Sequence, residues 1–300
     1  MSNVLETFDL TKKYGRVTAV SNLSFSIKQG QVFGILGPNG SGKTTTLGIL
    51  SGVTNATSGN FEWFGQTGGH EIRQKQGIIL ERPNFYPYMS AYKNLKVVAA
   101  IKSISNADER INSVLKQVGL FERRNDRFKT YSLGMKQRLS IGSALLSNPK
   151  VLVLDEPTNG LDPQGIAEIR ELIIQIAKEG KTIVLASHLL DEVQKVCTDF
   201  MILSKGKLMH QGPVAEVIGE TQKVELASEN EEDLNKALDQ IDFVAHKSFE
   251  NGVFKVVLTD SGTAAELNSI LNNQGIALNH LVKVKQSLEQ KFLEILKQND

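Results

Sequence analysis

The chain carries the glycine-rich stretch Gly37-Pro38-Asn39-Gly40-Ser41-Gly42-Lys43-Thr44, with Thr45 directly after it, between an apolar run at 32–36 and a segment of helical character at 44–51. The pattern G-x-x-x-x-G-K-[ST] therefore stands between a predicted strand and a predicted helix. Glycines let backbone N–H groups converge on phosphate oxygens, and the amino terminus of the helix adds its positive dipole. We predict a phosphate-binding loop at 37–45, in which Lys43 places a charge on the β- and γ-phosphates and Thr44 binds Mg²⁺.

A second motif supplies carboxylates. The apolar run 151–154 leads directly into Asp155 and Glu156. A buried strand delivers its terminal side chains to the carboxyl edge of a parallel sheet, where the phosphate-binding loop also lies. An acidic turn after a strand is common by itself, but the phosphate-binding loop favours a catalytic interpretation. We expect Asp155 to bind Mg²⁺ through water and Glu156 to act as a base or water-positioning group.

The composition is that of a globular chain with enough apolar mass for a sizeable core: 300 residues, 40% apolar and 22% charged. Residues 220–300 carry 14 acidic and 8 basic side chains, which leaves the first 219 residues at +7 within a total of +1. Neither part is basic enough to favour nucleic acid as a partner, so we predict none.

The cellular location follows from three features. Cys197 is the single cysteine, which excludes an internal disulfide and fits a reducing compartment. No apolar run approaches the roughly 18 residues that span a bilayer. Residues 1–13 lack the regions of a signal peptide. We therefore expect a cytoplasmic chain whose work at a membrane needs a separate membrane partner.

Predicted elements divide the chain into two domains, 1–219 and 220–300. In the first, strands alternate with helices from residue 151 onward, which favours a parallel sheet covered on both faces. A helical subdomain at about 85–148 is inserted there, because apolar residues recur at helical spacing: Leu95, Val98, Ala99, Ile101, Ile111, Val114, Leu115 and Val118. The second domain has the order βαββαβ, which is ferredoxin-like, with a closing helix at 287–297.

The segment Tyr131-Ser132-Leu133-Gly134-Met135-Lys136-Gln137-Arg138 resembles the signature motif of ABC transporter ATPases. Together with Gly160-Leu161-Asp162-Pro163 at family spacing, it extends the resemblance over nearly all of residues 1–219. The resemblance implies an α/β fold with a P-loop NTPase core of the ABC ATPase type, and the element order of residues 220–300 adds a small α+β domain after it. Tyr131, Leu133 and Met135 depart from the commonest signature. Ser132 and Gly134 are retained and are expected to contact ATP bound to the opposing subunit, and Asp162 is expected to be a further nucleotide-binding residue.

Two further residues match functional positions of the family. His188 follows a predicted strand and matches the switch histidine that contacts the γ-phosphate. Tyr14 matches the aromatic residue that stacks on adenine, where a flat ring supplies affinity without a particular hydrogen-bond pattern. The resemblance thus implies that Lys43, Glu156 and His188 carry the catalysis.

Glu81 stands where the family usually has the glutamine of the Q-loop. The carboxylate still accepts from Mg²⁺ or its water, but it adds a negative charge beside the phosphates. The aromatic cluster at 85–88 after it has two interpretations: a satellite core, or the surface that receives a helix of a membrane partner. Glutamate here, with the departures in the signature, resembles the branch of bacitracin- and lantibiotic-resistance exporters.

The residues and the resemblance predict an ATP-hydrolysing subunit of an exporter, with ATP and Mg²⁺ as cofactors. Two such subunits, identical or homologous, would close on ATP and drive a separately encoded membrane permease from the cytoplasmic face of the membrane. A soluble ABC ATPase that acts on ribosomes or DNA is an alternative, as is a small-molecule kinase or GTPase. Such ribosomal relatives usually hold two cassettes in one chain, repair relatives insert long coiled coils, and GTPases carry N-K-x-D; this sequence has none of these.

Overall fold

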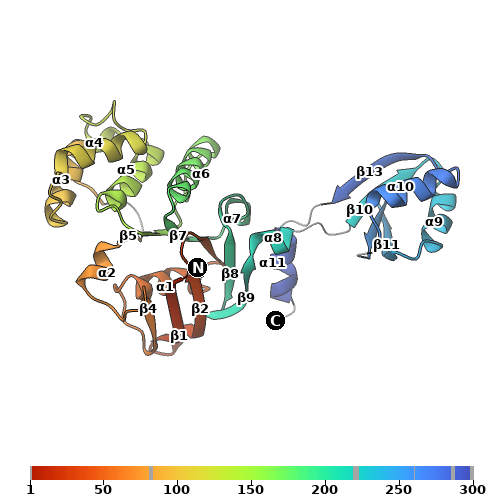
Figure 1. The fold of residues 1–300 in the computed structure, drawn as a ribbon, viewed down its shortest axis with the longest axis horizontal. Helices are drawn as coiled ribbons and strands as arrows, with labels where there is room; N and C mark the ends of the chain where they lie inside the picture. The colour runs from red at the N-terminus through yellow and green to blue at the C-terminus, as the bar shows by residue number, and fades with distance from the viewer. Residues whose placement is uncertain (1, 81–83, 219–222, 260, 285–287, 298–300) are drawn as a thin grey trace. The chain divides into compact units, whose positions relative to one another are not determined.

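The computed structural model describes residues 2–80, 84–218, 223–259, 261–284 and 288–297 (Figure 1). The chain divides into two compact units: one runs to Val214 and includes the chain from Phe292 onward, and the other comprises Ala215–Lys291. The sequence places the boundary a few residues later, within 219–222, which lie outside the described residues. It also assigns the closing helix to the second domain, whereas most of that helix, α11 (Leu288–Lys297), groups with the first unit.

A six-stranded sheet forms the centre of the first unit. Its strand order is β5-β6-β7-β3-β8-β9, with all neighbours parallel except the pair β8–β9. The strands are β3 (Val32–Leu36), β5 (Gln76–Ile79), β6 (Val151–Asp155), β7 (Thr182–Ser187), β8 (Asp199–Ser204) and β9 (Lys207–Pro213). The predicted parallel sheet is confirmed; the two outer strands, β5 and β9, are additions that the sequence pattern did not reveal.

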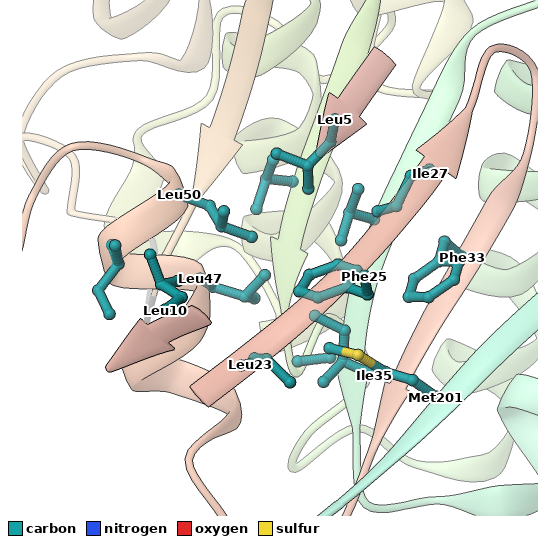
Figure 2. Close-up of a cluster of buried hydrophobic side chains, with 14 of the residues drawn as sticks. Leu5, Leu10, Leu23, Phe25, Ile27, Phe33, Ile35, Leu47, Leu50 and Met201 are labelled. Atoms are coloured by element: carbon teal, nitrogen blue, oxygen red, sulfur yellow. The ribbon is translucent and has the colours of Figure 1, made fainter. Parts of the chain in front are cut away.

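A three-stranded antiparallel sheet, β2-β1-β4, encloses the main core with the central sheet. Its strands are β1 (Asn3–Tyr14), β2 (Val17–Lys28) and β4 (Ser58–Trp63). Figure 2 shows the shared core, in which Phe25 of β2 stacks on Phe33 of β3 with ring centroids 5.9 Å apart. Because side chains from β1, β2, β3 and α1 (Lys43–Leu50) fill this core, the helix that follows the glycine-rich stretch is held in place by apolar burial.

The helical part of the first unit has the expected apolar core. It contains α3 (Ala91–Ile101), α4 (Ala107–Gln117), the 3₁₀ turn η1 (Phe128–Thr130) and α5 (Leu133–Leu145). The predicted core residues Leu95, Ala99, Ile111, Val114, Leu115 and Val118 are buried, and Val98 is half-buried. Ile101 is not buried: it is the last residue of α3 and is 78% exposed, because it stands two residues after the buried Ala99 and so points to another side of the helix.

The remaining helices of this unit are α2 (His70–Gln74), α6 (Pro163–Lys178), α7 (Leu190–Val196) and α8 (Val214–Ile218), which crosses the boundary between the units. α6 begins three residues before its predicted start at 166. Asp162 accepts a hydrogen bond from the Gly165 backbone N–H at 2.8 Å, and Pro163 occupies the first helical turn, where its missing N–H costs nothing.

The second unit has the predicted order βαββαβ. Its elements are β10 (Lys223–Ser228), α9 (Glu231–Asp239), β11 (Val244–Glu250), β12 (Val253–Leu258), α10 (Ala264–Asn273) and β13 (Leu278–Val284). The strands form one antiparallel sheet in the order β11-β12-β10-β13, and its apolar core includes side chains of α9 and α10. The expected hairpin turn is at Asn251 and Gly252, which both have positive φ angles.

Gly34 lets α7 lie directly on β3. A Cβ atom added at Gly34 would stand 2.7 Å from Val193 Cγ1 and 3.1 Å from Cys197 Sγ, both buried. Burial also raises the pKa of the Cys197 thiol strongly, so the thiolate is disfavoured in the folded chain. The position of α7 therefore depends on the absence of a side chain at residue 34.

We expect Gly34→Ala to push α7 from the sheet and to lower the free energy of unfolding by about 1–3 kcal/mol, the usual cost of overpacking. Urea unfolding followed by the fluorescence of Trp63, the only tryptophan, measures this change. Adding Val193→Ala to the Gly34→Ala chain removes the methyl groups in the way and should recover part of the loss; a double variant no more stable than Gly34→Ala would exclude this contact as the cause.

Candidate active site

The phosphate-binding loop connects β3 to α1 in a backbone conformation that requires glycine. Gly42 has a φ of +104°, and a Cβ atom there would lie 2.4 Å from the Ala19 carbonyl oxygen. At Gly37 an added Cβ would lie 2.3 Å from the Leu203 carbonyl oxygen. The loop is thus packed against the backbone at Ala19 and Leu203.

The amino end of α1 is arranged for an anion. Gly42 at the N-cap offers no side-chain cap, and the first turn of α1 contains no acidic residue. Such a helix end leaves N–H groups and a partial positive charge for phosphate oxygens. Ser41 Oγ is buried and has no hydrogen-bond partner among the described residues. The loop therefore presents donors that a phosphate group would satisfy.

Lys43 lies under the loop and is only 6% exposed. Its ammonium donates to the carbonyl oxygens of Gly37 at 2.8 Å and Pro38 at 3.3 Å, and stands 3.6 Å from Glu156 Oε1. A buried ammonium needs such acceptors, because an unpaired buried charge is costly. These contacts hold the Lys43 charge at the loop.

Glu156 and His188 meet because their strands are neighbours. Asp155 at the end of β6 pairs with Ala186 of β7, and the Glu156 N–H donates to the Ala186 carbonyl oxygen at 3.0 Å. Glu156 has a φ of +46°, a conformation that is uncommon for a residue with a side chain and is often found at functional sites. Its Oε2 is 2.7 Å from His188 Nδ1. The carboxylate thus stands between an ammonium and an imidazole.

These groups line one pocket of about 480 Å³. Its lining contains the predicted residues Tyr14, Asn39, Gly40, Gly42, Lys43, Thr44, Thr45, Glu156 and His188, together with Ala19 and Asn159. Tyr14 is 51% exposed, and the Lys12 ammonium lies 4.8 Å from the centre of its ring. Asn159 is an addition to the predicted set; its position three residues after Glu156 is the only sequence signal that could have revealed it.

The expected contacts for an opposing subunit lie in a second pocket, of about 470 Å³. Ser132, Gly134 and Asp162 all line it, and the first pocket contains none of them. Ser132 caps α5 by accepting from the Met135 backbone N–H, as Asp162 caps α6. The structure therefore collects the predicted site residues at two places on one chain.

The residues present fit a nucleotide-held Mg²⁺. Thr44 is exposed at the pocket wall, and Asp155 is buried at the carboxyl end of β6. In the described ranges, no group of three or more His, Cys, Asp or Glu side chains is placed to hold a metal ion. Mg²⁺ bound with a nucleotide needs only one or two protein oxygens, because phosphates and water supply the others. Glu81, the third predicted ligand, lies outside the described residues.

The aromatic cluster at 85–88 has features of both a satellite core and an exposed surface. Phe85 packs against Phe128 with ring centroids 5.2 Å apart, whereas Tyr86 and Tyr88 are 48% and 64% exposed. Asn94, which the sequence did not single out, organises this loop: it is buried, accepts from the Tyr86 N–H and donates to the Tyr86 carbonyl oxygen. The loop thus presents two tyrosine rings on a backbone fixed by an amide.

A mainly parallel sheet with a glycine-rich loop between β3 and α1, and a glutamate beside the loop's lysine, define the class of the chain as a P-loop nucleotide-binding protein. Residues 20–159 match the ABC transporter family. The bacitracin transport ATP-binding protein BcrA of Bacillus licheniformis is 37% identical over 305 residues, which cover 99% of this chain and 98% of that protein.

Solved structures agree with this match. The cbiO1 structure from Clostridium perfringens, part of the ABC transporter complex cbiONQ, gives a TM-score of 0.68 at 30% identity over 73% of this chain and 92% of that chain. The dimeric ATP-binding cassette MJ0796 bound to ADP and Pi gives 0.63 at 25% identity over 70% and 98%. The chain belongs to the ABC transporter family, and it is an ATP-binding and ATP-hydrolysing subunit of a transporter.

We predict that Tyr14→Ala weakens ATP binding about tenfold, because stacking of a base on an aromatic ring contributes about 1–3 kcal/mol. Tyr14→Phe keeps the ring and should bind ATP within about twofold of the parent chain. Calorimetric titration with Mg-ATP measures both affinities. If the alanine and phenylalanine variants bind alike, adenine does not stack on residue 14.

Proposed function

We propose that the chain hydrolyses ATP at a site shared between two ATPase subunits and thereby drives a membrane permease that exports its substrate. One observation carries the proposal: each chain presents two different half-sites, one with the phosphate-binding loop and the other with Ser132, Gly134 and Asp162. The dimeric cassette bound to ADP and Pi among the structural relatives supports the same arrangement. The second subunit would be another copy of this chain or a homologous subunit.

In the first half-site, Lys43 would bind the β- and γ-phosphates. Glu156 would orient the attacking water or take its proton, and His188, which contacts Glu156, would contact the γ-phosphate. Phosphoryl transfer asks little covalent work of the protein, so positioning and neutralisation of charge account for most of the catalysis. The positive groups at the loop would neutralise charge that develops on the transferred phosphoryl group.

Mg²⁺ would be held by Thr44 and, through water, by Asp155, with Glu81 as a further oxygen ligand. The ion would supply charge that offsets the phosphates. Glu81 adds a negative charge where the family usually has a neutral amide, so it would weaken the net positive field at this place. If this charge is merely tolerated, Glu81→Gln preserves or raises the rate of ATP hydrolysis, whereas a large loss of rate would show that the acid is required for Mg²⁺ or for coupling.

The second half-site would close over the ATP of the opposing subunit. The Ser132 hydroxyl would donate a hydrogen bond to the γ-phosphate, and the amino terminus of α5 would add its positive dipole. ATP then contributes contacts to both subunits and favours the closed dimer, and hydrolysis removes part of those contacts. Because the contacts differ before and after hydrolysis, ATP hydrolysis would shift the dimer from its closed to its open form.

The permease would meet the surface formed by Tyr86 and Tyr88. The side chains are exposed on a loop that Asn94 anchors from within, a combination that suits contact with a partner more than solvent. The subunit would therefore sit at the cytoplasmic face of the membrane. None of the helices in the described part of the chain combines the length and apolarity that crossing a bilayer requires.

The likeness to the bacitracin transport protein favours an antibiotic peptide or similar compound as the exported substrate. A pull-down from native membranes with tagged Glu156→Gln protein and Mg-ATP tests the transport function. A stoichiometric polytopic membrane protein is the expected result. Recovery of ribosomes or DNA without any membrane protein would support the alternative of an ABC ATPase that acts on them.

Glu156→Gln should lower the turnover of ATP about 100-fold or more while leaving ATP affinity nearly unchanged, because the amide cannot take a proton but has the same shape. The variant should elute as a dimer in the presence of Mg-ATP during size-exclusion chromatography. Glu179→Gln, at the exposed carboxyl end of α6, is the control and should hydrolyse ATP like the parent. Unchanged turnover in Glu156→Gln would remove Glu156 from this role.

A further inference from the structure

Helix α6 carries two charged residues, Glu168 and Arg170, that pair with different helices. Glu168 Oε2 lies 3.6 Å from Arg138 Nη2 of α5, and Arg170 Nη1 donates to Glu192 Oε1 of α7 at 3.0 Å. Residues two positions apart on a helix point to different sides of it. α6 therefore contacts a helix on each side through an ion pair.

The two partner helices belong to different half-sites. Ser132 caps α5 and Asp162 caps α6, and both residues line the second pocket. α7 begins two residues after His188, whose imidazole lines the first pocket. The Ser187 hydroxyl accepts from the Leu189 N–H at 3.0 Å, so the segment between β7 and α7 is short and tied down. A shift of α7 would consequently move His188.

Glu192 has the most buried side chain of the four residues in these pairs. Its side chain is 10% exposed, and its second carboxylate oxygen is buried with no hydrogen-bond partner in the described part of the chain. Burial raises the pKa of Glu192, and the attraction of Arg170 offsets only part of that shift. The folded chain thus holds a proton at Glu192 more readily than the unfolded chain does, so the carboxylate lowers stability at pH 7.

A buried carboxylate that lowers stability invites a role other than stability. We propose that the pairs Arg138–Glu168 and Arg170–Glu192, which we call the α6 bridge, position His188 of one half-site relative to Ser132 and Asp162 of the other within the same chain. Arg138 and Glu168 line the second pocket, whereas Arg170 and Glu192 line neither pocket, so the Arg170–Glu192 pair acts on both half-sites only through the helices and is a pair of positioning residues. The inference rests on the proposed function, because the two half-sites have different occupants only in a two-subunit site.

The α6 bridge would couple the two half-sites of one chain during ATP hydrolysis. When Glu156 and His188 change their contacts as the γ-phosphate is lost, α7 can move only by straining or breaking its pair with α6. The helix α6 then transmits the displacement to the elements that hold Ser132 and Asp162. Each half-site in a chain would in this way sense the state of the other.

The test uses the full chain and begins with Glu192→Gln. Turnover at saturating Mg-ATP should fall about five- to tenfold, the range expected for residues that carry coupling between sites. The dissociation constant for ATP should stay within about twofold, because the phosphate-binding loop keeps its contacts. Stability should fall modestly, because Arg170, whose side chain is 24% exposed, loses its partner; a role in folding alone would predict that loss without this split between turnover and affinity.

A second readout is independent of activity. Cys197 ends α7 and is buried beneath it, so its rate of alkylation reports local release of that helix. Glu192→Gln should raise this rate several-fold. Arg170→Gln breaks the same pair from its more exposed partner and should reproduce both effects, which keeps the test informative if one variant folds poorly.

Matched controls lie on the same helices. Asp191→Asn removes an exposed ion pair with Lys195 from α7, and Glu171→Gln removes an exposed charge from α6. Both should hydrolyse ATP and react at Cys197 like the parent. The parent and Glu156→Gln are measured in the same assay. If the parent does not hydrolyse ATP, the proposed function is wrong. If the parent hydrolyses ATP, the result for Glu192→Gln tests the α6 bridge alone.

The two pairs are then compared in a double-mutant cycle. Glu168→Gln should lower turnover in the same manner, and the Glu168→Gln/Glu192→Gln chain should be little worse than the worse single variant, because either break disconnects the bridge. Losses that multiply would show two separate effects and overturn the proposal. Turnover of Glu192→Gln within about twofold of the parent would overturn it as well.

Discussion

The site depends on the parallel pairing of β6, β7 and β3. This register places the end of β6 beside the end of β7, so that the Glu156 N–H reaches the Ala186 carbonyl and the carboxylate reaches His188. β3 is the next strand, and the phosphate-binding loop leaves from its carboxyl end. A shift of one residue in any of these strands would turn its side chains to the opposite face of the sheet and separate these groups.

Apolar burial maintains that register. The core shown in Figure 2 joins the antiparallel sheet, the central sheet and α1, and Trp63 donates its indole N–H to the Leu50 carbonyl at the end of α1. The loop is therefore held at its helical end by a packed helix and at its strand end by a buried strand. Because both ends are held, the glycine-rich loop keeps one conformation. Its small residues then offer backbone N–H groups to a ligand.

The sequence could predict that these residues share one edge of the sheet because they stand next to strand ends. The phosphate-binding loop, Glu156 and His188 each follow an apolar run that reads as a buried strand, and strands of a parallel sheet end at a common edge. Contacts between surface helices have no such signal. Glu192 and Arg170 are 22 residues apart with no repeating spacing, and Asn94 resembles any polar residue of an amphipathic helix. Their roles follow from packing of helices, which the pattern of one helix does not determine.

Two glutamates illustrate how burial decides what a carboxylate does. Glu156 is 21% exposed and has a lysine and a histidine as neighbours, so its charge is balanced on two sides at the place where a nucleotide would bind. Glu192 has one arginine and an unsatisfied oxygen, so burial is the larger effect on it. A carboxylate of the second kind holds its arginine firmly, because a separated pair would leave a buried charge alone. That asymmetry makes the Arg170–Glu192 contact stiff even though it contributes little to stability, and stiffness is the property that a link between two half-sites requires.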